Sequence, residues 1–127
     1  MRPIIIATAA ALMLLSAPAL AAGLPTRLGQ CANSTVASVE TRLTDGSKPV
    51  ADSGSAISFA NNGYQVSYDQ IAAVDTSRIG DPVRLCLVSI PQGCPPGDDR
   101  GREYKTTNLR THRSWTLPDS QHSCGGA

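Results

Sequence analysis

Residues 55–68 read SAISFANNGYQVSY and contain the clearest strand pattern of the chain. Apolar Ile57 and Phe59 alternate with small polar residues, and alternation with this period is typical of a half-buried strand. The same pattern resumes after the turn at Tyr64, Val66 and Tyr68. Between the two runs, Asn62-Gly63 tolerates the positive φ angles that a tight hairpin turn needs. The segment therefore predicts a β-hairpin over residues 56–68.

The segments on either side of this hairpin also have strand patterns. In residues 34–43, Glu40 and Arg42 fall on a polar face, and the other face, which we expect to be buried as in a half-buried strand, carries Ala37, Val39, Thr41 and Leu43. Residues 83–90 are nearly all apolar or β-branched, which predicts a central strand covered on both faces. Cys86 lies in the middle of that strand, where we expect a buried disulfide.

The rest of the chain is punctuated by Gly and Pro about every ten residues, a spacing typical of all-β domains. Residues 102–118 predict a second hairpin, whereas residues 69–78 suit either a helical turn or a loop. No convincing amphipathic helix follows the first 21 residues. The expected fold is all-β: a small antiparallel barrel or sandwich, SH3-like or OB-like, with five to six short strands and two disulfides.

The first 21 residues have the organisation of a cleaved secretory signal peptide. Arg2 is followed by an apolar run over residues 4–15, and Ala19-Leu20-Ala21 forms an A-x-A cleavage pattern. Pro18 interrupts the run before the chain reaches the roughly 20 apolar residues that a membrane span needs. We expect this segment to be removed. The remaining residues 22–127 would form one small β domain in the periplasm or outside the cell, with no membrane span.

All four cysteines follow this segment, and an even number in an exported chain predicts two disulfides. Sequence alone allows three pairings of Cys31, Cys86, Cys94 and Cys124. We favour Cys31–Cys86 with Cys94–Cys124, because the second bond would tie the C-terminal tail to the proline-rich loop. In the chain-entropy description, closing a loop of about 30 residues stabilises a fold by roughly 3–4 kcal/mol.

The charge composition argues against nucleic acid as a partner. The chain has 11 Lys and Arg residues and 10 Asp and Glu residues, and removal of Arg2 leaves equal numbers. A neutral domain has no overall attraction to polyanions. Segment 100–113 is locally basic and has Tyr104 and Trp115 nearby, but export favours a glycan or a partner protein as its contact.

Candidate catalytic and metal-binding residues are few. His122 and Cys124 have a short H-x-C spacing, but a zinc site needs three or four ligands, and an oxidised cysteine cannot supply one. The acidic residues of segment 98–103 lie beside two arginines, and we interpret them as part of a solvated turn. No serine lies in a nucleophile elbow, and paired cysteines leave no thiolate. We therefore expect no catalytic residue, no metal and no cofactor.

His112 follows the predicted turn over residues 108–111, at a position that often has a left-handed backbone. Glycine is preferred there and histidine is tolerated, so we interpret His112 as a turn residue. In a domain with one Trp and one Phe, tryptophan is more often a core anchor than a surface contact, so we interpret Trp115 as part of the core. The residues that we select as a candidate contact surface are Ser53, Ser55, Phe59, Arg110, His112 and Trp115.

The C-terminal third contains four short motifs: CPPGDDRG (94–101), TNLRT (107–111), SWTLPD (114–119) and a terminal CGGA. With these motifs the chain resembles a group of small uncharacterised exported proteins of proteobacteria. That resemblance implies a location outside the cytoplasm and brings no activity with it. Separately, SGSAISF (53–59) is similar to the inhibitory loop of the periplasmic lysozyme inhibitors. Phe59 stands where that loop has Tyr, and no basic residue precedes it.

From these observations we expect a non-catalytic periplasmic or secreted β domain that binds an unknown protein or an envelope glycan. The alternative is an inhibitor of a foreign hydrolase such as lysozyme, with Ser53, Ser55 and Phe59 on its contact loop. A small hydrolase is less consistent with the sequence, because no nucleophile–base pair stands out.

Overall fold

The computed structural model describes residues 3–5, 9–13 and 23–126. The predicted signal peptide falls mostly outside these residues, so its removal stays a prediction. Within the described ranges, no helix is long and apolar enough to cross a membrane.

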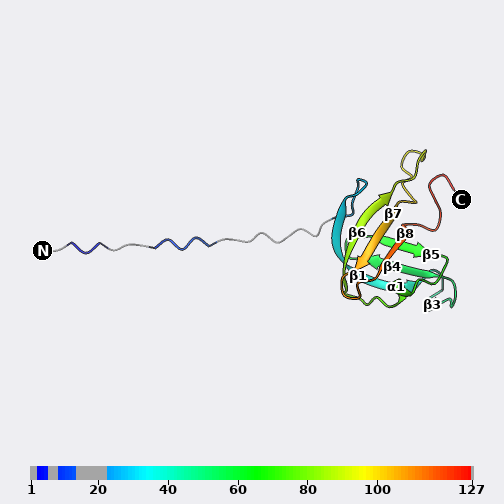
Figure 1. Cartoon of the computed structure of the whole chain (residues 1–127), viewed down its shortest axis with the longest axis horizontal. Coiled ribbons are helices and arrows are strands. Elements are labelled where there is room, and N and C mark those ends of the chain that lie inside the picture. Colours follow the sequence, from blue (N-terminus) through cyan, green and yellow to red (C-terminus); the bar gives the residue numbers. More distant parts are fainter. Residues whose placement is uncertain (1–2, 6–8, 14–22, 127) are drawn as a thin grey trace.

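Six strands form one antiparallel sheet in the order β5-β4-β1-β6-β7-β8, and the sheet curls into a half-barrel (Figure 1). The short strands β2 and β3 pair separately. This architecture confirms the predicted all-β class with about six antiparallel strands. The elements are β1 (Cys31–Thr41), β2 (Thr44–Asp45), β3 (Lys48–Pro49), β4 (Ser55–Phe59), β5 (Tyr64–Ser67), α1 (Ala72–Asp75), β6 (Pro82–Ser89), β7 (Glu103–Asn108) and β8 (Ser114–Pro118).

Strand β1 changes its main partner halfway along its length. Its first half pairs with β6 and its second half with β4, and the register shifts between Val36 and Ser38. The extra residue, Ala37, bulges and is exposed, whereas Val36 is buried. The predicted burial of Ala37 is therefore wrong, because a bulge reverses the alternation of faces. Leu43 was also expected inside, but it lies beyond β1 and is exposed.

The hairpin predicted over residues 56–68 is confirmed as β4 and β5. Its loop contains four residues, and Phe59 N–H donates to the Gly63 carbonyl at 2.8 Å across it. Asn62 has the positive φ of 68°, while Gly63 is not among the positive-φ residues. Only the asparagine of the Asn-Gly pair therefore uses the left-handed conformation that the sequence suggested for both.

Strand β6 is central in the sheet, as predicted, but only one of its faces is covered. Val83, Leu85 and Leu87 are buried, while the alternate residues Arg84 and Val88 are exposed. The prediction of cover on both faces is wrong because the sheet curls around a single core on its concave side. Cys86 consequently lies on the convex side, half-buried rather than buried.

The two disulfides are Cys31–Cys86 and Cys94–Cys124, which confirms the favoured pairing. The first joins residues directly opposite each other on β1 and β6. The concave side is filled by a single cluster to which helix α1 contributes Ala73 and Val74. Its other buried members are Val36, Ile57, Phe59, Val83, Leu85, Leu87, Tyr104, Trp115 and Leu117.

The half-barrel is closed by the side chain of Gln65, which joins the first and last strands of the sheet. Its Nε2 donates to the carbonyls of Tyr104 and Leu117 at 2.7 and 3.0 Å. Its Oε1 accepts from Thr106 Oγ1 at 2.6 Å and from Trp115 Nε1 at 2.9 Å. Gln65 has no exposed surface, and these four bonds use both polar atoms of its amide.

We expect Gln65→Met to lower the free energy of unfolding by about 3 kcal/mol or more, because it leaves buried polar partners without hydrogen bonds. Gln65→Glu should lower the free energy of unfolding at pH 7 by more than Gln65→Met does, since a carboxylate would face two carbonyl oxygens. That environment would raise the glutamate pKa above its unfolded value of about 4.3, so part of the stability should return as the pH falls toward that value. Urea unfolding at several pH values measures both effects. Equal stability of Gln65→Glu and wild type at pH 7 would contradict the closure by Gln65.

Candidate functional site

Two turns lie side by side at one end of the half-barrel, in its lower part in Figure 1. One turn, residues 76–81, links α1 to β6, and the other, residues 109–113, links β7 to β8. Leu109 N–H donates to the Pro82 carbonyl at 2.8 Å, and Arg110 Nε pairs with Asp81 Oδ1 at 2.6 Å. These contacts join the two turns into one unit, which we call the loop end.

Asp81 is the centre of the hydrogen bonds that fix the loop end. Its carboxylate is almost fully buried and accepts from Arg110, from Asn108 Nδ2 at 2.9 Å and from Arg78 N–H at 2.8 Å. The Arg110 guanidinium holds the pKa of Asp81 well below its usual range. Asn108 Oδ1 in turn accepts the N–H groups of Arg110 and Thr111. Both turns are therefore held by buried polar groups, and the loop end is preorganised.

His112 has a φ of 60° and donates its N–H to the Asn108 carbonyl at 2.8 Å. The prediction that His112 occupies a left-handed turn position is therefore confirmed. Its side chain is exposed.

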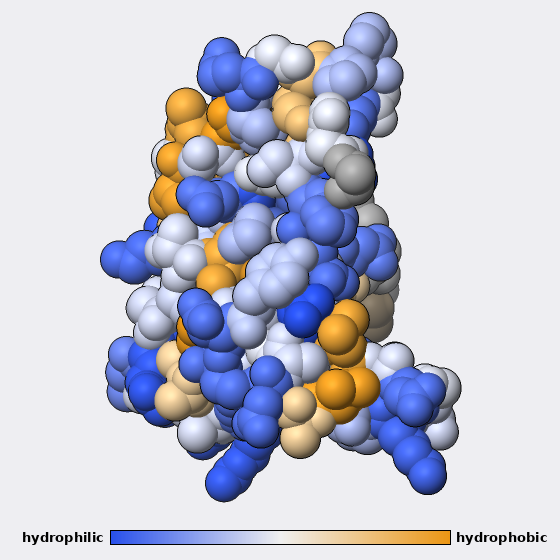
Figure 2. Space-filling model, turned by 90° about the vertical axis from the view of Figure 1, so that its right-hand side faces the viewer, coloured by the Kyte–Doolittle hydropathy of each residue, from blue (hydrophilic) through white to orange (hydrophobic). Residues whose placement is uncertain are grey.

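The outward side of the loop end is apolar and cationic. Ile79 is 76% exposed and Leu109 is 43% exposed. Arg78, His112 and Arg113 are also exposed. Neither Arg78 nor Arg113 forms an ion pair with a carboxylate of the described residues. On the face shown in Figure 2, apolar residues form separate patches among hydrophilic ones.

Four of the six residues predicted as a contact surface are buried, so that prediction is wrong for them. Ser53 Oγ donates to the Val50 carbonyl, and Ser55 Oγ donates to Asp75. Phe59 and Trp115 belong to the core, which confirms the interpretation of Trp115 as a core anchor. The loop proposed to inhibit a hydrolase through Ser53, Ser55 and Phe59 is therefore not a free surface.

The other two predicted contact residues, Arg110 and His112, come together at the loop end. Sequence reasoning missed Ile79 and Leu109, which are its most exposed apolar residues. A signal was present, because each is an aliphatic residue inside a turn, in SRIGD (77–81) and TNLRT (107–111). Such residues have no core to face when the turn projects from a sheet.

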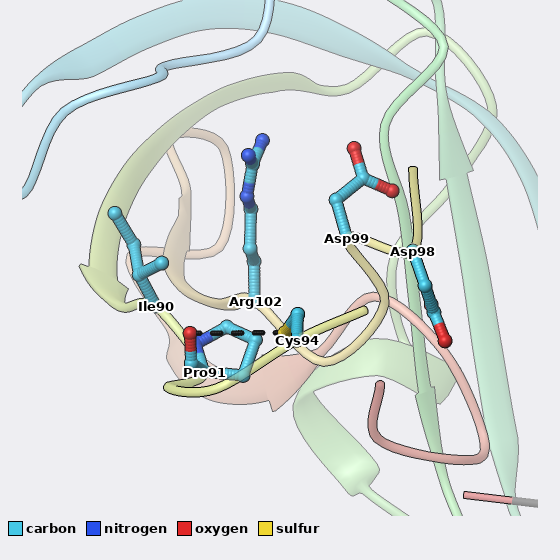
Figure 3. Close-up of a pocket in the computed structure, with 6 residues that line it drawn as sticks. All are labelled: Ile90, Pro91, Cys94, Asp98, Asp99 and Arg102. Atoms are coloured by element: carbon cyan, nitrogen blue, oxygen red, sulfur yellow. Dashed lines mark hydrogen bonds between the residues drawn. The ribbon is translucent and has the colours of Figure 1, made fainter. Parts of the chain in front are cut away.

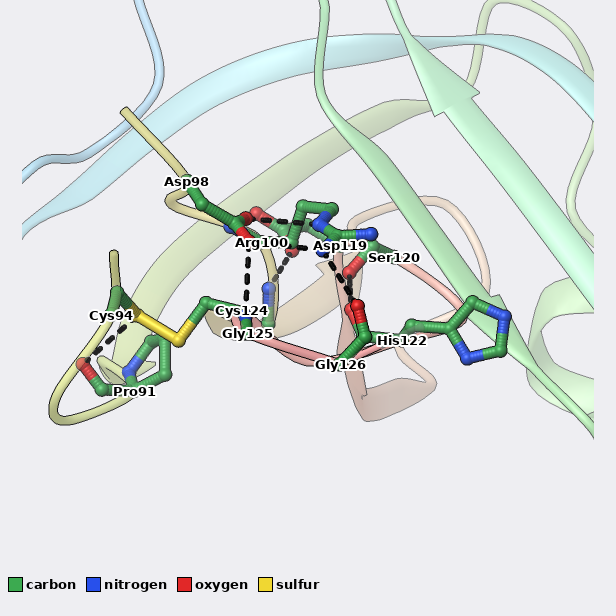
Figure 4. The surroundings of a disulfide bond; sticks show 11 residues. Pro91, Cys94, Asp98, Arg100, Asp119, Ser120, His122, Cys124, Gly125 and Gly126 are labelled. Atoms are coloured by element: carbon green, nitrogen blue, oxygen red, sulfur yellow. Dashed lines mark hydrogen bonds and ion pairs between the residues drawn. A yellow bond between two sulfur atoms is a disulfide. The ribbon is translucent and has the colours of Figure 1, made fainter. Parts of the chain in front are cut away.

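The acidic segment after Cys94 builds a second candidate at the other end of the half-barrel. A hollow of about 140 Å³ is lined by Ile90, Pro91, Cys94, Asp98, Asp99 and Arg102 (Figure 3). Asp98 pairs with Arg100 at 2.9 Å and accepts Gly125 N–H at 2.9 Å, while Cys124 N–H donates to the Arg100 carbonyl (Figure 4). The Arg100 pair holds the pKa of Asp98 below its usual range. These groups attach the C-terminal tail to the loop.

Reactive groups are scarce in the part of the chain that the structure describes. All four cysteines are in disulfides. No group of three or more His, Cys, Asp or Glu side chains among these residues could hold a metal ion. The His122 ring points away from the Cys94–Cys124 bond (Figure 4).

No family model, no curated protein and no solved structure matches this chain.

Asp81 should make unfolding sensitive to acid. Its folded-state pKa lies below the unfolded value of about 3.9, so its contribution to stability is present above that pH and is lost as the pH falls. We expect the melting temperature of wild type to fall between about pH 4 and pH 2. The difference in melting temperature between wild type and Asp81→Asn should become smaller over that range. Asp45→Asn, at an exposed position of β2, is the control. A gap that stays constant with pH would rule out this role for the Asp81 carboxylate.

His112→Gly should keep or raise the melting temperature, since glycine adopts positive φ without strain. His112→Val should lower the free energy of unfolding by about 1–2 kcal/mol, because a β-branched residue is disfavoured at this φ. Both variants keep the backbone N–H that bonds to Asn108. Thermal unfolding compares them, and a clear loss in His112→Gly would show that the imidazole itself stabilises the turn.

Proposed function

We propose that the protein is a non-catalytic binding domain that works in the periplasm or outside the cell and contacts a component of the cell envelope through its loop end. Two disulfides support an oxidising location, since such bonds persist outside the reducing cytoplasm. The predicted signal peptide and the resemblance of the C-terminal third to exported proteins are consistent with that location.

The observation that carries the proposal is an isoleucine, 76% exposed, on a turn that the buried carboxylate of Asp81 holds in place through its ion pair with the partly exposed Arg110. A turn that is already fixed loses little backbone freedom when its exposed aliphatic side chains bind a partner. Burying Ile79 and Leu109 in a complex would contribute about 2–4 kcal/mol. The neighbouring Arg78 and Arg113 would add selectivity for negative charge.

The chemistry of the remaining polar groups also supports binding rather than catalysis. The two carboxylates with strongly lowered pKa values, Asp81 and Asp98, are each engaged by an arginine. Ion pairs of this kind stabilise turns, and neither carboxylate is placed beside a nucleophile that it could activate.

Envelopes isolated from bacteria provide a test that does not depend on the kind of partner. The exported protein is mixed with washed envelopes and sedimented, and its bound fraction is compared with that of an Ile79→Ser/Leu109→Ser variant. We expect the variant to bind at least about tenfold more weakly, because about 1.4 kcal/mol of lost contact gives that factor. The matched control is Leu28→Ser/Val88→Ser, which removes two exposed apolar residues elsewhere.

The control variant should bind like wild type, and thermal unfolding should show that both variants fold. The proposal is rejected if wild type does not sediment with envelopes, or if the two variants lose binding equally.

A further inference from the structure

We infer that the loop end docks on an anionic lipid surface, with Ile79 and Leu109 entering the headgroup layer and Arg78 and Arg113 meeting its phosphates. This inference rests on the proposed function and names the partner class for the same surface. It starts from the local arrangement of charge and apolar surface.

The cations and the apolar side chains lie on the same small unit. Arg78 and Ile79 are adjacent in the turn that precedes Asp81, and Leu109 is bonded through its backbone to Pro82, just after that turn. Arg113 Nη1 lies 3.5 Å from Thr76 Oγ1, two residues before Arg78. Both arginines therefore belong to the same two joined turns as the apolar pair.

The two turns have a net positive charge because they contain three arginines, Arg78, Arg110 and Arg113, and one acidic residue. Asp81, the single acidic residue within the two turns, is buried and pairs with Arg110. Asp75, just before the first turn, accepts hydrogen bonds from the neutral Ser55 and Gln70, so it lowers the positive charge of this region without cancelling it. Arg78 and Arg113 consequently remain available to an anionic group outside the protein.

The shape of the loop end favours a lipid surface over a peptide. Two hollows among the described residues are lined by residues 90–102 and by residues 33–61, and neither of these two includes a residue of the loop end. A bound peptide segment needs a groove for its side chains. Projecting aliphatic residues can instead enter a deformable headgroup layer, and cations beside them add attraction to anionic lipids.

Weak reversible binding is expected, because a shallow apolar insertion and a few basic residues each give only part of the affinity. The two contributions respond to different conditions. Attraction between exposed charges and headgroups is screened by salt, whereas the apolar contribution is not.

Vesicles of pure phospholipid test the inference without any envelope protein or glycan. The exported protein is sedimented with phosphatidylcholine vesicles and with vesicles that contain about 30% phosphatidylglycerol. We expect at least about tenfold stronger binding to the anionic vesicles, and a loss of that preference when salt is raised from about 0.1 M to about 1 M.

Two pairs of variants locate the contact. Arg78→Gln/Arg113→Gln should abolish the preference for anionic vesicles, and Ile79→Ser/Leu109→Ser should weaken binding to them at both salt concentrations. The matched control is Arg84→Gln/Lys105→Gln, which removes two exposed cations from the convex side of β6 and β7. That control should bind like wild type.

The inference is overturned if wild type binds both vesicle types equally, or if the control loses as much binding as Arg78→Gln/Arg113→Gln. Binding to isolated envelopes without binding to vesicles would reject the lipid and leave the proposed function standing, with a protein or glycan as partner. Loss of binding to envelopes as well would reject both.

Discussion

The structure depends on the amide of Gln65, which joins the two ends of the curled sheet around the hydrophobic core. Strands β5 and β8 are at the two ends of the sheet order, and a curled sheet with free ends would leave Trp115 and Tyr104 beside an open seam. Glutamine is well suited to the seam because one side chain offers two donors and an acceptor with two lone pairs. It accepts from the indole N–H and from the Thr106 hydroxyl, while it donates to two backbone carbonyls. The buried polar groups of both edges are thereby paired.

The fold class and both main hairpins could be predicted from period-two alternation and turn residues, whereas the sequence predicted two disulfides and left three pairings open, of which the favoured one is present. Gln65 could not, because a polar residue between two apolar ones in a strand has the pattern of a solvent-facing position. Its burial depends on β8, about 50 residues away in the chain. The bulge at Ala37 was missed for a similar reason. It arises where β1 changes partner, which is a property of three strands rather than of one segment.

Some residues of the candidate site could likewise be predicted from the sequence, and others could not. Arg110 and His112 could be selected because their turn is encoded locally, and the left-handed backbone of His112 follows from its place in that turn. The segment that contains Ser53 and Ser55 has the composition of an exposed polar loop. Both side chains are nevertheless buried and form hydrogen bonds to Val50 and Asp75. Ile79 is part of the candidate site only because its turn lies beside the turn that contains Leu109. Apposition of two turns depends on tertiary structure and leaves no periodic pattern in the sequence.

The order of the disulfides along the chain bears on how the native bonds can form. Cys31 joins Cys86, and both precede Cys94 and Cys124, so the two covalent loops follow one another and do not overlap. A polypeptide that enters an oxidising compartment with its N-terminus first exposes its thiols in this same sequence. If each pair of thiols is oxidised in the order in which it enters, Cys31 pairs with Cys86 and Cys94 then pairs with Cys124, which is the native connectivity. Maturation by that route needs an oxidant and does not require a disulfide isomerase.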